Sequence, residues 1–155
     1  MRLFLLSLVA TLGLNAITAA PTATLSQAHY DLAEIVFRDC ISHSDQESVY
    51  HLSSGTNDAV LPADFMERFK GQSPLVRSTS DGTTIVNNRW LTDKLTKKPA
   101  ARLSIREIRA GRHSAEAQLH YVSSSTTVSA RYYLVREHGK WRVRDQKTEF
   151  IACRR

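Results

Sequence analysis

The sequence predicts an α+β protein in which an N-terminal helix and a short second helix pack on a curved antiparallel sheet, an arrangement called a roll. Apolar residues recur at helical spacing between Thr24 and Ser42, which indicates one amphipathic helix. The C-terminal third, Ala101–Arg155, instead alternates apolar and polar residues in successive short runs, as antiparallel strands do. Because such a sheet has one apolar face, we expect the helices to cover it.

The first 20 residues have the three-part layout of a secretory signal peptide. A basic start, Met1-Arg2, precedes an apolar run from Leu3 to Leu14, and small residues follow up to Ala20. The run is too short to span a bilayer, and the segment holds no cysteine for a lipid anchor. We therefore expect cleavage after Ala19 or Ala20, no stable membrane anchor, and a periplasmic or secreted mature chain. The alternative is a buried N-terminal helix.

The remaining residues, 21–155, are enough for a single α+β roll domain. The whole chain has 21 Lys and Arg against 15 Asp and Glu, a formal charge of +6, and loss of Arg2 with the signal peptide lowers it by one. The basic residues are scattered along the predicted strands, which is typical of a solvated face. An anionic envelope surface is the alternative partner. Because no basic stripe occurs, we expect no nucleic-acid partner.

Between the first helix and the C-terminal third, the sequence predicts a short strand, a short helix and two further strands. Pro62 and Gly71 bound the short helix, since proline suits a first helical turn and glycine a helix end. The strand predicted at Leu75–Ser78 is expected at a sheet edge. The four are predicted at Val49–Leu52, Ala63–Lys70, Leu75–Ser78 and Thr83–Leu91.

The C-terminal third predicts four consecutive strands. Three alternating runs cover 102–108, 115–122 and 128–136, and a fourth begins at Lys140. His138-Gly139 predicts a two-residue hairpin loop, because glycine readily supplies positive φ. The third run is partly apolar on both faces, so we place it centrally. In the fourth, the alternation slips near 145–147, which predicts a bulge there.

The two cysteines, Cys40 and Cys153, allow one pairing. In an exported chain an even cysteine count favours a disulfide. This one would tie the first helix to the last strand and stabilise the fold by roughly 4–5 kcal/mol in the chain-entropy model. Two free thiols are the alternative. Two thiols alone do not hold zinc, so we predict no metal site.

The predicted order of helix, strand, small helix and curved antiparallel meander resembles the nuclear-transport-factor-2-like (cystatin-like) roll. Several segments also look like parts of small, uncharacterised bacterial exported or membrane-associated proteins, over about residues 27 to 151. That wider superfamily includes isomerases, dehydratases and binding modules, so the resemblance implies a fold but no catalytic residues. The segments are Val49–Ser53, Phe65–Gly71, Pro74–Val76 and Tyr133–Trp141.

No motif for nucleophilic, metal or phosphate chemistry occurs, so we predict no cofactor. Asp39 and His51 are the nearest candidates for a general acid or base, and we assign no catalytic residue beyond them. The strand alternation directs a mostly aromatic set of side chains into the space between the first helix and the sheet. These predicted pocket residues are Tyr50, Leu119, Tyr121 and Tyr132.

Three functions remain open. We favour a noncatalytic envelope module that binds a small apolar ligand or another envelope protein, because the predicted pocket holds no acid or base placed there by the alternation. The alternatives are a small-molecule enzyme of the isomerase or dehydratase kind, and an inhibitor or immunity-type protein that docks on another exported protein. The sequence leaves the oligomeric state, the ligand and the partner open.

Overall fold

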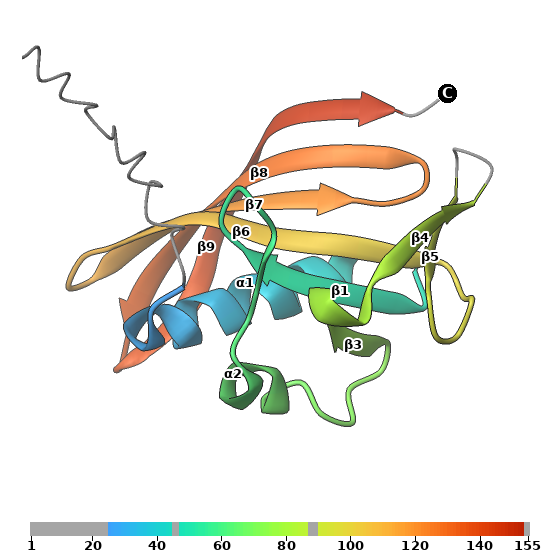
Figure 1. Cartoon of the computed structure of the whole chain (residues 1–155). Coiled ribbons are helices and arrows are strands. Elements are labelled where there is room, and N and C mark those ends of the chain that lie inside the picture. Colours follow the sequence, from blue (N-terminus) through green and yellow to red (C-terminus); the bar gives the residue numbers. More distant parts are fainter. Residues whose placement is uncertain (1–24, 45–46, 87–89, 154–155) are drawn as a thin grey trace, which may run out of the picture.

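The computed structural model describes residues 25–44, 47–86 and 90–153 (Figure 1). Two helices pack on a large, curved, mostly antiparallel sheet, so the predicted α+β class is confirmed. The predicted signal peptide and its cleavage site lie outside the described residues. Within those residues, no helix has the length and apolar character that crossing a bilayer requires.

The helices are short and the C-terminal strands are long. A 3-10 turn, η1 (Gln27–His29), leads into the longer helix, α1, and a second turn, η2 (Thr79–Asp81), follows β3. The helices and strands in chain order are α1 (Tyr30–His43), β1 (Val49–Ser54), β2 (Ala59–Val60), α2 (Ala63–Glu67), β3 (Leu75–Ser78), β4 (Thr83–Val86), β5 (Trp90–Asp93), β6 (Ala100–Ala110), β7 (Ser114–Val122), β8 (Thr126–Glu137) and β9 (Lys140–Cys153).

The main sheet has seven strands in the order β2-β1-β6-β7-β8-β9, with β3 alongside β1. Strand β1 runs parallel to both β3 and β6, whereas the β6-β7-β8-β9 meander is antiparallel throughout. The predicted edge strand Leu75–Ser78 is therefore an edge strand, and the third meander strand, β8, has a neighbour on each side as expected. Strands β4 and β5 form a separate two-stranded sheet.

The core lies between α1 and the concave face of the main sheet. The helix buries the stripe that includes Leu32, Val36 and Phe37, because these positions fall on one helical face. Alternate strand residues such as Leu103 and Leu119 meet that stripe. The second helix joins the same core through an aromatic cluster of Tyr30, Phe37, Phe65 and Phe69.

The meander carries the predicted turn and more bulges than predicted. His138 and Gly139 have φ of 50° and 78°, the conformation that a two-residue hairpin loop requires. The register of β9 against β8 skips one residue at Arg144 and another at Glu149, on either side of the predicted bulge at 145–147. A third skip, at Arg106, lies between β6 and β7. Each extra residue bends and twists its strand, which helps to curve the sheet.

Two of the elements predicted between the first helix and the C-terminal third differ from the structure. The single strand predicted over Thr83–Leu91 is a hairpin, β4 and β5, whose pairing joins Ile85 to Leu91. The predicted helix over Ala63–Lys70 ends at Glu67, because the following turns use shorter i→i+3 bonds, such as Phe69 N–H to the Met66 carbonyl at 3.0 Å. Both differences concern where chain direction changes, which apolar spacing describes poorly.

Candidate functional site

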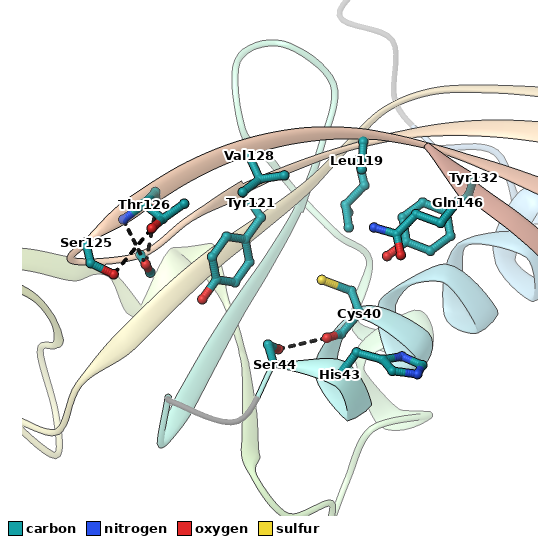
Figure 2. A pocket seen from close by; sticks show the side chains of 12 residues that line it. Cys40, His43, Ser44, Leu119, Tyr121, Ser125, Thr126, Val128, Tyr132 and Gln146 are labelled. Carbon is teal, nitrogen blue, oxygen red and sulfur yellow. Dashed lines mark hydrogen bonds between the residues drawn. The ribbon is translucent and has the colours of Figure 1, made fainter. Parts of the chain in front are cut away.

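A cavity of about 280 Å³ lies between the C-terminal end of α1 and the concave face of β7, β8 and β9 (Figure 2). Figure 2 shows the α1 side chains below the cavity and the strand side chains above it. The lining combines hydroxyls with apolar groups: Cys40, His43 and Ser44 from α1 and its end, Ser123, Ser125 and Thr126 around the β7–β8 turn, and Leu119, Tyr121, Val128, Ala130, Tyr132 and Gln146 from the strands. We call this the concave cavity.

The structure places three of the four predicted pocket residues in this lining: Leu119, Tyr121 and Tyr132. Tyr50 is fully buried and is not part of the lining. The Tyr50 hydroxyl donates to the Ser44 carbonyl at 2.8 Å and lies 2.9 Å from the Ser44 hydroxyl. Tyr50 therefore positions Ser44, which does line the cavity.

The thiol and phenols of the concave cavity are held in their neutral forms. The pKa of Cys40 is raised to about 12, because burial and, to a smaller extent, the nearby Asp39 charge outweigh the lowering effect of a hydrogen bond with Tyr132. Burial likewise raises the pKa of Tyr121 to about 12 and raises the pKa of Tyr132. At neutral pH these groups are hydrogen-bonding groups and not bases or nucleophiles, since a thiol reacts as the thiolate.

Asp39, one of the two predicted acid–base candidates, lies beside the concave cavity without lining it. Its charge contributes to the raised pKa of Tyr132. No hydrogen bond joins its carboxylate to Tyr50 or Tyr132 in the described part of the chain. The neighbouring His43 does line the cavity, but its side chain is 75% exposed and its Nδ1 lies 2.8 Å from the Asp39 carbonyl. His43 is therefore a rim residue.

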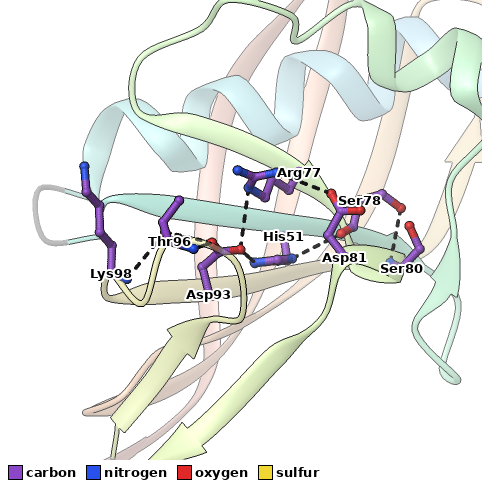
Figure 3. Close-up of polar contacts among 8 residues, drawn as sticks. All are labelled: His51, Arg77, Ser78, Ser80, Asp81, Asp93, Thr96 and Lys98. Carbon is purple, nitrogen blue, oxygen red and sulfur yellow. Dashed lines mark hydrogen bonds and ion pairs between the residues drawn. The ribbon is translucent and has the colours of Figure 1, made fainter.

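His51, the other candidate, lies far from the concave cavity, on the opposite face of β1. Alternation along β1 directs Tyr50 and Leu52 into the core and His51 away from it. Figure 3 shows His51 held between Ser78 and Asp93: one ring nitrogen is 3.1 Å from the Ser78 carbonyl and the other is 3.0 Å from Asp93 Oδ1. Both ring nitrogens are thus occupied by the protein, so His51 has none left for a substrate proton.

Asp93 is the centre of this buried polar cluster. Its Oδ2 accepts hydrogen bonds from the Thr96 N–H at 2.6 Å and the Thr96 hydroxyl at 2.7 Å, while Arg77 Nε lies 3.5 Å from Oδ1. Burial tends to raise the pKa of Asp93, but the Thr96 hydrogen bonds and the charges of Arg77 and His51 outweigh it and lower the pKa. The cluster fixes the turn after β5 against β1, which is a structural role.

Sequence reasoning missed one carboxyl near the concave cavity. Burial raises the pKa of Glu47 to about 6. The charge of Glu47 acts on Tyr50 and Tyr121, so its carboxyl lies near them. Glu47 nevertheless lines a neighbouring cavity with Arg38 and Gln72. No sequence motif surrounds Glu47, so its position near the concave cavity could be recognised only from the fold.

The predicted disulfide is not formed: Cys40 and Cys153 are both free. Cys40 lies beside Tyr132, whereas Cys153 pairs with Thr126 across β8 and β9. Thr126 and Tyr132 are separated by about 20 Å along β8, since a strand rises roughly 3.3 Å per residue. Disulfide-bonded residues need Cα atoms within about 7 Å.

The comparisons with known proteins leave the family open. No protein-family model matches the chain. None of the curated proteins compared with it gives a significant match. Among solved structures, the chain is similar to an NTF2-like protein of unknown function from Shewanella baltica, with a TM-score of 0.39 and 12% identity over 83% of this chain and 95% of that one. We transfer no residue role from it. No cluster of three or more potential metal-ligating side chains occurs among residues 25–44, 47–86 and 90–153.

The two cysteines are expected to react differently with iodoacetamide in the native protein. Cys153 is exposed and should be alkylated first, whereas Cys40 is half-buried with a pKa of about 12 and should react only after unfolding. Peptide mass mapping before and after denaturation measures both. A crosslinked Cys40–Cys153 peptide under nonreducing conditions would contradict the structure.

Replacement of Asp93 by Asn should destabilise the protein by about 3 kcal/mol at pH 7, because it leaves Arg77 next to a neutral group in a buried cluster. The folded pKa of Asp93 is below its ordinary value of 3.8, so the stabilisation is present above that pH and is lost as the pH falls through the folded pKa. The difference between wild type and Asp93→Asn in urea unfolding should therefore shrink in acid.

The matched control is Asp31→Asn, which removes an ion pair with Arg68 from an acid that is 74% exposed. It should change the free energy of unfolding by less than about 1 kcal/mol. Equal effects of the two substitutions would show that the buried cluster contributes no more than a surface pair.

Proposed function

We propose that the protein is a noncatalytic module that binds a small, neutral, amphipathic ligand in the concave cavity. The observation that carries this proposal is the chemical character of the lining. Hydroxyl groups from Tyr121, Tyr132 and Ser44 accompany an apolar wall of Leu119 and Val128. Such a lining can hydrogen-bond one side of a ligand and bury the other.

The electrostatics of the concave cavity support a neutral ligand. A buried charge is strongly unfavourable without a paired countercharge. The raised pKa values of Cys40 and Tyr121 keep both groups uncharged at neutral pH. No Lys, Arg, Asp or Glu is among the lining residues. His43, a titratable lining residue, is 75% exposed at the rim, so a charged ligand would find no countercharge in the buried part of the cavity.

The alternative enzyme function depends on Glu47. A carboxyl with a pKa near 6 is suited to proton transfer at neutral pH. An isomerase or dehydratase would need that carboxyl to reach a ligand beside Tyr121. Because Glu47 lines the adjacent cavity and not the concave one, binding without catalysis is the better-supported function.

We also propose that the module acts in the periplasm or outside the cell. The support is the layout of residues 1–20, with a basic start, an apolar run and small residues before Pro21. Its partner in that compartment is a small ligand or another envelope protein. An exposed pair near the end of β9, Phe150 and Ile151, would suit the second kind of partner.

Neutral fragments should bind in the concave cavity more tightly than charged fragments of the same size. The probes are phenol and benzamide, with benzoate and benzylamine as charged counterparts, and binding is measured by NMR chemical-shift changes in the purified protein. Val128→Trp should abolish binding by filling the cavity from β8.

Leu95→Trp is the control for this experiment, because it adds the same side chain at a position that is 63% exposed and outside the cavity. Glu47→Gln should leave fragment binding unchanged. Tighter binding of benzoate, or fragment binding that persists in Val128→Trp, would refute the proposed site. Turnover of a candidate substrate that Glu47→Gln abolishes would favour the enzyme instead.

Export predicts a processed N-terminus. Intact-mass measurement of the protein that accumulates in a Gram-negative host should give a chain that begins at Ala20 or Pro21. Leu8→Arg interrupts the apolar run and should leave the precursor unprocessed. A wild-type protein that retains Met1 at its site of accumulation would contradict the proposal.

A further inference from the structure

A separate cavity, of about 210 Å³, lies on the face of the sheet opposite the concave cavity. It is lined by His51, Asp58, Val60, Thr79, Thr83 and Arg102. Arg102 is the register partner of His51 on the neighbouring strand, so both point away from α1. The wall opposite them comes from η2 and the start of β4. We call this the convex cavity.

Two polar groups of the convex cavity lack hydrogen bonds. The Thr79 hydroxyl oxygen and the Arg102 Nε are buried, and neither has a hydrogen-bond partner in the described part of the protein. A buried polar group without a partner is unfavourable, and in a native protein it calls for a bound molecule or another specific cause. His51 does not share this property, since both of its ring nitrogens have partners.

Opposite charges lie side by side in the convex cavity without forming a hydrogen bond. Arg102 NH1 is 4.0 Å from Asp58 Oδ2, which exceeds the 2.7–3.2 Å range of a hydrogen bond. The other oxygen, Asp58 Oδ1, accepts from the Ser53 hydroxyl at 3.2 Å. Oδ2 of Asp58 and the guanidinium of Arg102 can therefore each bind a group in the cavity.

The backbone holds Asp58 in place for this purpose. Asp58 has φ of 51°, a left-handed conformation that aspartate and asparagine tolerate better than most residues. Arg106 also contacts the loop that contains Gly55 and Asp58. Its NH1 donates to the Gly55 carbonyl at 2.7 Å, and its NH2 lies 3.6 Å from Asp58 Oδ1. Arg106 itself does not line the cavity.

We propose that the convex cavity binds a small zwitterion, such as a free α-amino acid with a short side chain. The ligand ammonium would pair with Asp58 and the ligand carboxylate with Arg102, while Thr79 and Thr83 supply hydroxyl donors to the carboxylate and Val60 contacts the side chain. A ligand of one charge would form a charge-assisted hydrogen bond with only one of Asp58 and Arg102, whereas a zwitterion can form one with each. The small volume excludes drug-sized ligands, which occupy about 300–1,000 Å³.

The probe is L-alanine, titrated into the purified protein and followed by NMR, with acetate and ethylamine as the two singly charged halves. L-alanine should bind saturably, and each half should bind about tenfold more weakly or worse, because it makes one of the two charge-assisted contacts. Failure of L-alanine to bind would overturn the proposal. Acetate that binds as tightly as L-alanine would show a simple anion site and would also overturn it.

Two substitutions test whether Asp58 and Arg102 bind the charged groups of L-alanine. Asp58→Asn and Arg102→Gln should each weaken L-alanine binding about tenfold or more, since each removes one charge. Asn keeps the left-handed backbone at position 58, so the loop is preserved. Arg109→Gln is the matched control on the same strand, because Arg109 pairs with Glu107 outside the cavity, and it should leave binding unchanged.

Thermal unfolding shows whether each variant is folded. Where Arg102→Gln does not fold, Thr83→Val decides the question, because it removes a hydroxyl donor while keeping the side-chain shape, and it should weaken L-alanine more than ethylamine. Folded Asp58→Asn and Thr83→Val variants that bind L-alanine like the wild type would overturn the proposal. None of these substitutions touches the concave cavity, so fragment binding there should persist in all of them.

Discussion

The mismatch in length between α1 and the strands it covers determines where the concave cavity lies. A helix of 14 residues spans roughly 21 Å, whereas the 14 residues of β9 span roughly 46 Å when extended. The helix therefore cannot cover the whole concave face. Toward the β7–β8 turn the sheet curves beyond the end of α1, and the concave cavity occupies the space that remains.

The strand alternation of β1 and β6 separates two kinds of chemistry. Residues that face α1 are apolar or neutral at physiological pH, because burial opposes their ionisation. Residues on the opposite face, such as His51 and Arg102, are polar or charged. They either form hydrogen bonds and ion pairs with neighbouring residues or face the convex cavity. The β1–β6 pair thus lines the convex cavity with charged groups, whereas the concave cavity, lined from α1, β7, β8 and β9, favours neutral ligands.

Local patterns in the sequence predicted those features that depend on neighbouring residues. Alternation was enough to direct Leu119, Tyr121 and Tyr132 inward, and His138-Gly139 was enough for the hairpin. Gln146 was not predicted in the cavity because its direction depends on the skipped residue at Arg144. Nor could local spacing bring Asp93 to His51 across 42 residues. The predicted disulfide was wrong for a related reason. The sequence does not show that Cys153 lies at one end of β9 while Cys40 lies beside Tyr132, farther along β8.

The bulges of β9 also affect what this strand can do beyond the fold. A terminal strand presents unpaired backbone groups, and a long regular one is a template for the strands of other molecules. Here Arg144 and Glu149 interrupt the regular spacing, and basic side chains at Lys140, Arg142 and Lys147 surround the interruptions. The backbone of an approaching copy would find no long matching ladder. The same residues that curve the sheet therefore protect its edge from aggregation.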